Sequence, residues 1–181
     1  MNLNAWYEKG KTADNYMDSL EVHKEGFQHI YDNFKLPEDK EFKQAIQNKN
    51  LRVVVLAEPW CGHCMLNIPI LLRLTEDAGI PIRILPRDEH IELMDQYLTN
   101  GNRTIPIFIF IDQDGNEVTK WGPISKITKE FVDNYRQDLP AKDAEDYQEK
   151  FEVLIKFTTK AFRENTNLWN GSYESIKQAL V

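Results

Sequence analysis

The two cysteines, and the strand pattern that precedes them, constrain the fold most strongly. Residues 51–57 read Leu-Arg-Val-Val-Val-Leu-Ala, a run that is apolar at every position except Arg52. Such a run is typical of a strand buried on both faces. Cys61 and Cys64 then open a segment, residues 61–78, whose apolar spacing predicts a helix. The sequence therefore predicts both thiols in the first turn of a helix that follows a buried strand.

The remaining segments predict a mixed α/β fold. The Asp-Gly pair at 114–115 favours a hairpin, because a tight turn needs residues that tolerate positive φ. The resulting order β-α-β-α-β-β-α implies a mixed central sheet with helices on both faces. A short helix is also expected just before the first strand. Besides residues 51–57 and 61–78, the expected elements are helices over 38–48, 88–100 and 124–138 and strands over 80–85, 105–111 and 117–121.

Helical segments extend the chain at both ends. Residues 12–34 predict one amphipathic helix, with Thr12 or Asp14 as its cap, and residues 143–165 and 172–180 predict two more. The apolar stripes of the outer helices must be buried, either on the central domain or in an interaction or dimer surface. The predicted organisation is an N-terminal helical extension over 1–35, an α/β domain over 36–138, and a C-terminal helical extension over 139–181 that packs on the same domain.

The charge and hydropathy pattern narrows the range of partners. The chain carries 22 basic and 29 acidic residues, a net charge of −7, and the basic residues form no stripe, so we expect no nucleic-acid partner. No stretch approaches about 18 consecutive apolar residues, so we expect no membrane partner. Because the first residues show no basic segment followed by an apolar one, we expect a cytoplasmic protein. Structural disulfides are rare in the cytoplasm, which favours a chemical role for the two cysteines.

The position of Cys61 suits a reactive thiol. Unpaired N–H groups and the macrodipole at a helix N-terminus stabilise an anion, and the thiolate is the nucleophilic form of cysteine. The three-residue spacing brings Cys64 within one helical turn, where a disulfide can close without large backbone movement. The predicted mechanism has Cys61 attack a substrate disulfide and form a mixed disulfide, which the more buried Cys64 then resolves.

The residues next to the cysteines have two interpretations each. A protonated His63 would favour the Cys61 thiolate and make the disulfide more oxidising; alternatively, His63 is an exposed helix residue without redox effect. Trp60 would present an apolar docking surface beside Cys61, or it packs as an ordinary residue at a strand end. The sequence leaves both pairs of alternatives open.

The run Trp60-Cys61-Gly62-His63-Cys64 resembles the active-site motif of the thioredoxin fold, in the Cys-Gly-His-Cys form typical of protein disulfide isomerases. Pro69 matches the proline that kinks the active-site helix of this family, and Ile105-Pro106 matches its cis-proline. The resemblance covers roughly residues 38–138. With its helical ends, the whole chain looks similar to a group of bacterial thioredoxin-like proteins with helical extensions.

The resemblance implies where a substrate binds. Pro106 should face the cysteines, and the Ile105 backbone should pair with an extended substrate segment. Trp60 and Gly62 would complete the substrate-binding surface. The proline ring, which has no N–H donor, would also discourage metal binding at the thiols. The only redox group implied is the Cys61–Cys64 disulfide, with no other cofactor and no metal.

One position departs from the family pattern. Family members usually carry a buried acid six residues before the first cysteine, where it assists proton transfer to or from the second, but this chain has Val55 there. Glu58 lies three residues before Cys61 and either replaces that acid or is a surface charge. The proton acceptor is therefore an open question at the level of sequence.

These features together predict an enzyme, a thiol–disulfide oxidoreductase that acts on protein or low-molecular-weight disulfides. Its reductant would be a thiol or a flavoenzyme. A redox-sensitive binding module without turnover is the main alternative. A structural zinc site lacks a second cysteine pair, and a Cys–His hydrolase lacks an in-line base, so both are disfavoured. His23, His29 and His90 show no ligand spacing with the cysteines.

Overall fold

The predicted central strand lies inside a four-stranded sheet of order β2-β1-β3-β4 in the computed structural model, which describes residues 1–181. β1 pairs in parallel with β2 and antiparallel with β3, which in turn pairs antiparallel with β4. Every β1 residue after Arg52 is buried, as expected for a strand covered on both faces. The strands are β1 (Arg52–Ala57), β2 (Ile82–Pro86), β3 (Ile107–Ile111) and β4 (Glu117–Trp121).

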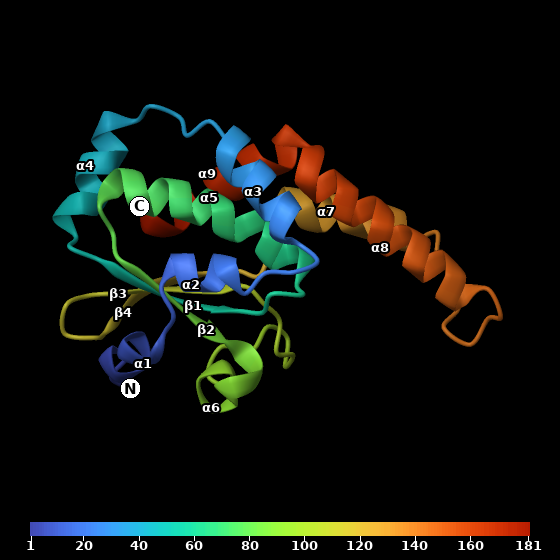
Figure 1. Ribbon diagram of the computed structural model, residues 1–181, viewed down its shortest axis with the longest axis horizontal. Helices are drawn as coiled ribbons and strands as arrows, with labels where there is room; N and C mark the ends of the chain where they lie inside the picture. Colours follow the sequence, from blue (N-terminus) through green and yellow to red (C-terminus); the bar gives the residue numbers. More distant parts are fainter.

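Helices cover both faces of this sheet. Figure 1 shows α4, α5 and α9 on one side and α1 and α6 on the other. The predicted mixed sheet with extra helices at both termini is confirmed. No helix combines the length and the apolar character that crossing a bilayer requires. The helices are α1 (Asn4–Lys9), α2 (Ala13–Asp18), α3 (Lys24–Asn33), α4 (Lys40–Asn48), α5 (Gly62–Ala78), α6 (Ile91–Met94), α7 (Lys126–Arg136), α8 (Tyr147–Glu164) and α9 (Thr166–Leu180), with one 3-10 turn, η1 (Arg87–Glu89).

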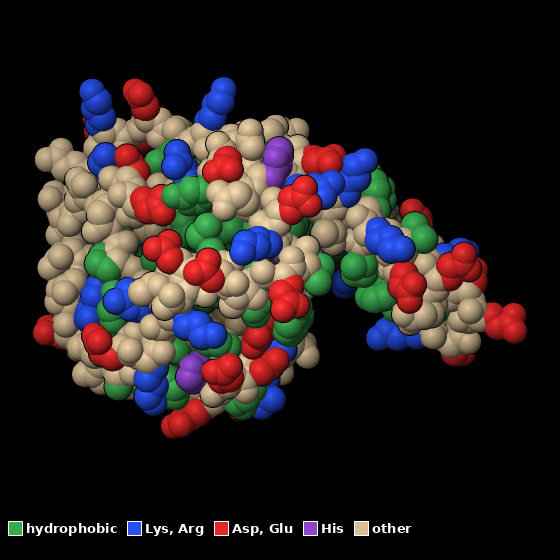
Figure 2. All heavy atoms as spheres, in the orientation of Figure 1, with side chains coloured by type: hydrophobic (Ala, Val, Ile, Leu, Met, Phe, Trp, Pro, Cys, Tyr) green, Lys and Arg blue, Asp and Glu red, His purple; other side chains and the backbone are tan.

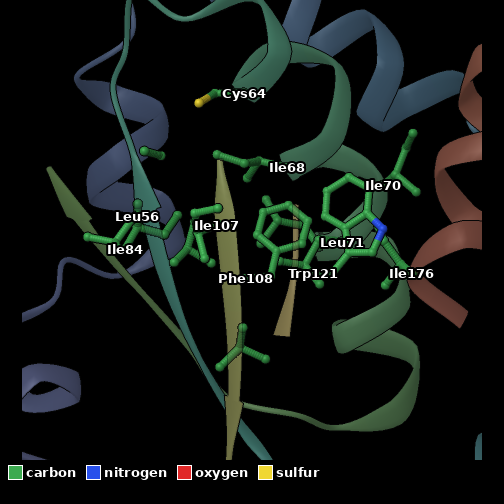
Figure 3. Packing of buried hydrophobic residues seen from close by; sticks show 14 of the residues in the cluster. Leu56, Cys64, Ile68, Ile70, Leu71, Ile84, Ile107, Phe108, Trp121 and Ile176 are labelled. Carbon is green, nitrogen blue, oxygen red and sulfur yellow. The ribbon is translucent and has the colours of Figure 1, made fainter. Parts of the chain in front are cut away.

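Helix α5 is fixed to the sheet by the hydrophobic core. Figure 3 shows Ile68 and Leu71 beside Leu56 and Phe108, with Cys64 at one end of this cluster. These side chains are almost completely inaccessible to solvent. Because protein cores are close-packed, α5 has little freedom to shift relative to β1 and β3. The first turn of α5, which carries the cysteines, is therefore held in place by the core.

The N-terminal segment does not form the single helix predicted over residues 12–34. It forms α2 and α3, separated by a turn after Asp18, and it is preceded by α1, which the sequence analysis did not predict. Thr12 caps α2, because its hydroxyl accepts the Asn15 N–H at 3.2 Å. The turn redirects the chain so that Leu20 is buried together with the apolar face of α3. Tertiary burial has overridden the local helical periodicity here.

The prediction of one helix over residues 88–100 is also wrong, because it is too long. Only η1 and α6 form there, and a tight bridge between Thr99 and Asn102 follows. Asn100 and Gly101 both have positive φ, 50° and 77°. Asparagine and glycine adopt this conformation more readily than other residues, so this pair ends the segment in a turn.

Helices α7 and α8 form an arm that projects from the body of the protein. Figure 1 shows α8 running outward beside α7, with the connecting loop at the far end. The inner half of α8 is docked through Leu154, Thr158 and Phe162, whereas Ile155 is 45% exposed. Helix α9 begins at Thr166, earlier than the predicted residue 172, and packs against α5 and β4.

Candidate active site

The two thiols lie where β1 meets α5. Cys61 is the N-cap of α5, and its Sγ accepts the Cys64 N–H at 3.2 Å. The Cys61 thiol also donates to the Ile105 carbonyl oxygen at 3.7 Å. Both cysteines are free thiols, and Cys64 is the more buried of the two. The site thus holds a dithiol at a helix N-terminus, in contact with the residue before Pro106.

The surroundings of the two thiols differ in their effect on acidity. The hydrogen bond with Cys64 lowers the pKa of Cys61, and the backbone N–H groups of Cys64 and His63 and the Arg87 guanidinium act in the same direction. Burial raises the pKa of Cys64 well above its ordinary value. Because the thiolate is the nucleophilic form of cysteine, this asymmetry favours reaction at Cys61 over reaction at Cys64.

The predicted proline site lies beside Cys61. The Ile105–Pro106 peptide bond is cis, and Ile105 is buried against the Cys61 sulfur. Gly122, at the end of β4, has a φ of +128° and packs against this turn. A Cβ atom at Gly122 would overlap the Pro106 carbonyl oxygen and stand 3.2 Å from the Ile107 Cα. Only glycine therefore fits behind Pro106.

Glu58 is buried, so the interpretation of this residue as a surface charge is wrong. It is 7% exposed, and its Oε1 accepts the Asp88 N–H at 2.8 Å. The negative charge of Glu58 also contributes to the raised pKa of Cys64. The structure thus places a buried carboxylate within electrostatic range of Cys64, although the usual acidic position is Val55. A role in proton transfer stays a prediction.

Tyr16 is a site residue that sequence reasoning missed. Its hydroxyl donates to the Glu58 carbonyl oxygen at 3.3 Å, and its side chain is buried. Burial and the nearby Cys64 and Cys61 sulfurs raise the pKa of Tyr16. Because Tyr16 belongs to α2, forty-five positions before Cys61, no local pattern links it to the cysteines.

His63 does not carry the proton that the first of its two interpretations requires. Its ring packs against Phe162 of α8 with 5.4 Å between ring centroids. Burial, together with the charge of Arg136, lowers the pKa of His63 to about 4. The imidazole is therefore neutral at pH 7, and it is not the exposed residue of the alternative interpretation either. The reason is tertiary, because α8 and α7 supply both neighbours.

We expect NMR titration of the His63 ring to show a pKa near 4. The folded value lies below the value of about 6.5 for an unfolded chain. Between those two pH values the unfolded chain binds more protons, so this contribution to stability is complete above about pH 6.5 and is lost as the pH falls toward 4. Arg136→Gln should raise the His63 pKa, whereas Lys156→Gln, a matched loss of charge on the exposed side of α8, should not. An unchanged titration in Arg136→Gln would contradict this account.

Trp60 and Gly62 flank the nucleophile differently. Trp60 is 56% exposed, its carbonyl oxygen lies 3.0 Å from His23 Nε2, and the Arg87 guanidinium lies 5.1 Å from its ring centroid. Trp60 is therefore a surface aromatic rather than a core residue. Gly62 faces α8, since a Cβ atom there would lie 3.9 Å from the Phe162 and Thr159 side chains.

His23 lines the same hollow as Cys61, whereas His29 and His90 lie apart from the thiols. His29 packs edge-on against Trp169, and His90 packs edge-on against Trp6. No three histidine, cysteine or acidic side chains come together in a geometry that could hold a metal ion. The absence of a metal at the thiols stays a prediction.

The fold and the site define a class of protein: a mixed α/β domain with a dithiol at a helix N-terminus beside a cis-proline. The family model described as thioredoxin matches residues 10–136. The chain belongs to the thioredoxin family. This match starts inside the segment predicted to be an N-terminal extension, and the domain boundaries stay a prediction.

Relatives at the level of sequence are distant. The chain is 36% identical to the protein disulfide isomerase-like 2-2 of Oryza sativa subsp. japonica over 66 residues, which cover 34% of this chain and 18% of that protein. It is 29% identical to a thioredoxin of Pyropia yezoensis over 93 residues, 50% of this chain and 84% of that protein. A thioredoxin of Porphyra purpurea is 28% identical over 53% of this chain and 90% of that protein. These similarities support a thiol–disulfide oxidoreductase in general terms.

Solved structures match nearly the whole chain. A protein of unknown function from Pseudomonas aeruginosa superposes with a TM-score of 0.62 at 14% identity, over 99% of both chains. An HIV epitope scaffold superposes with a TM-score of 0.62 at 16% identity, over 99% of this chain and 95% of the scaffold. At such identities the likeness shows the fold alone. The superposition agrees with the thioredoxin-like fold and extends over the helical segments at both ends of the chain.

Proposed function

We propose that this protein is a dithiol–disulfide oxidoreductase that reduces disulfides with Cys61 and Cys64. The observation that carries the proposal is the opposite effect of the site on its two thiols, lowering the pKa of Cys61 and raising that of Cys64. A thiol that its surroundings make more acidic thus stands beside a second thiol that its surroundings make less acidic, as a nucleophile and a resolving thiol require.

The proposed reaction proceeds in two exchanges. The Cys61 thiolate attacks one sulfur of a substrate disulfide; the Cys61–substrate bond forms, and the other substrate sulfur leaves as a thiolate that takes up a proton. Cys64 then loses its proton and attacks the Cys61 sulfur, which closes the Cys61–Cys64 disulfide and releases the first substrate sulfur. Two electrons pass from the dithiol to the substrate. We propose the buried carboxylate of Glu58 as the acceptor of the Cys64 proton.

The proposal assigns roles to the other predicted residues. Ile105 and Pro106 would present a backbone edge to an extended substrate segment, and the exposed Trp60 would contact the substrate beside Cys61. No cofactor besides the Cys61–Cys64 disulfide is proposed. A thiol or a flavoenzyme would return two electrons to that disulfide. We also propose a cytoplasmic location, without nucleic-acid or membrane partners, and membership in the bacterial branch of the family.

A redox titration tests this function. The purified protein is equilibrated in thiol/disulfide buffers, free thiols are alkylated, and the state of both cysteines is measured by mass spectrometry. We expect one reversible two-electron transition in which Cys61 and Cys64 are oxidised together, and catalysed reduction of a small disulfide by a dithiol. Independent oxidation of the two cysteines would contradict the mechanism. Reversible oxidation without catalysis would favour a redox-sensitive binding module.

A further inference from the structure

Helices α7 and α8 form one side of a groove that Cys61 also lines. The groove has a volume of about 310 Å³, and Trp60 lines it beside Cys61. Leu154, Ile155 and Phe162 of α8 line its apolar wall. Figure 2 shows the hollow between the projecting arm and the body, with hydrophobic side chains on both sides of it. We call this feature the arm groove.

The charge in the arm groove differs from that of the protein as a whole. The chain has a net charge of −7, yet no aspartate or glutamate lines the groove. Arg136, the last residue of α7, lines it and makes no ion pair. An unpaired cation beside an apolar wall favours an occupant that is apolar along its length and carries a negative charge.

The length of the apolar wall selects among possible occupants. Phe162 lies eight positions after Leu154, which corresponds to about 12 Å along a helix. A peptide in extended conformation covers about 12 Å with roughly four residues. A low-molecular-weight thiol without an apolar side chain would leave most of this wall uncovered. Because Cys61 lines the groove, a segment joined to the sulfur that Cys61 attacks can enter it.

We propose that the arm groove binds a segment of a protein substrate that flanks the attacked disulfide, with an apolar side chain against Leu154 and Ile155 and a carboxylate facing Arg136. This inference rests on the proposed oxidoreductase function and names its substrate class. The arm thus gives the site a preference for protein disulfides next to apolar and acidic residues. Arg136 and Ile155 are specificity-determining residues in this scheme, and Cys61 and Cys64 perform the exchange described above.

Matched peptides test the proposal on the full-length protein. Each peptide carries one cysteine in a disulfide with a chromogenic thiol, and dithiothreitol regenerates the enzyme. The peptides differ by Leu or Ser, and by Glu or Lys, within four positions of the cysteine. We expect kcat/KM to be about ten-fold higher for Leu than for Ser, from partial burial of the side chain. We expect it to be about three- to five-fold higher for Glu than for Lys, as for an exposed ion pair.

Variants with matched controls identify the residues responsible. Arg136→Glu should reverse the Glu-over-Lys preference, whereas Lys156→Glu, the same charge change on the exposed side of α8, should leave it unchanged. Ile155→Ser should reduce the Leu-over-Ser preference, whereas Val153→Ser, a 63% exposed residue outside the groove, should not. Ile155 is itself 45% exposed, so its replacement should not unfold the protein. Each preference is a ratio of two substrates on one variant, so changes in thiol reactivity cancel.

The outcomes separate this proposal from the general function. If a peptide-free chromogenic disulfide is reduced and all peptides react alike, the arm groove does not select substrates and the inference is wrong. If the peptide-free disulfide reacts faster than every peptide, the site prefers low-molecular-weight disulfides and the inference is again wrong. If no disulfide is reduced, the oxidoreductase function fails and this inference fails with it.

Discussion

Replacing Cys64 with serine should convert the protein into a covalent trap for its substrates. Cys61 should remain reactive because the serine hydroxyl can still donate to its sulfur in place of the Cys64 thiol, and the backbone N–H groups and the Arg87 guanidinium act in the same direction on its pKa. It would form the mixed disulfide, but no second thiol would resolve it. We expect steady-state reduction to fall by about a thousand-fold or more, as for the loss of other nucleophiles. Non-reducing gels and mass spectrometry should show substrate linked to Cys61.

Cys61→Ser is the matched control for this trap. It should lose as much activity yet retain no substrate, because Cys64 is buried and its pKa is raised. The double replacement should behave like Cys61→Ser. Covalent capture by Cys61→Ser at a rate similar to that of Cys64→Ser would reverse the assignment of nucleophile and resolving thiol.

Gly122→Ala should destabilise the protein more than any conservative change at the surface. Gly122 has a φ of +128°, which L-residues rarely adopt, and an added methyl group would meet the backbone of Pro106 and Ile107. Such a backbone conformation alone costs about 1–3 kcal/mol. Because backbone atoms cannot rotate away, we expect a total loss of about 3 kcal/mol or more in the free energy of unfolding. Chemical denaturation followed by circular dichroism measures it.

Gly79→Ala separates the two causes. Gly79 also has a positive φ, 69°, but a methyl group there would meet no atom within 4 Å. It should therefore cost about 1 kcal/mol, from backbone conformation alone. Gly122→Ala should also lower activity, because it displaces Pro106. The neighbouring Ile105 carbonyl oxygen accepts the hydrogen bond from the Cys61 thiol. Equal destabilisation by the two substitutions would show that close packing behind Pro106 is unimportant.

The centre of the candidate site was accessible from sequence because its signals are local. Cys61 and Cys64 lie three positions apart at the junction between a buried strand and a helix, and both boundaries were predicted within a residue or two. The expectation that Pro106 lies beside this junction, however, came from the family resemblance. Nothing in the spacing of the two segments would have brought Ile105 to within 3.7 Å of the Cys61 sulfur.

The electrostatic surroundings of the cysteines were not accessible in the same way. Tyr16, Arg136 and Phe162 lie far from residues 61–64 in the chain and reach them only through packing. His63 shows the consequence, because neither of its two interpretations from sequence is correct. A histidine at that position of an isolated helix would be solvated and would keep its ordinary pKa, whereas under α8 it is desolvated.

The sequence by itself determined the sheet, the active-site helix and the pair of thiols, because apolar runs, helix periodicity and motif spacing are properties of neighbouring residues. The tertiary structure decided in which direction the pKa values of those thiols and of His63 shift, that Glu58 is buried, and that α7 and α8 line a groove beside Cys61. Burial, electric fields and cavity shape arise from atoms distant in the chain. They exist only once the helices have packed against one another.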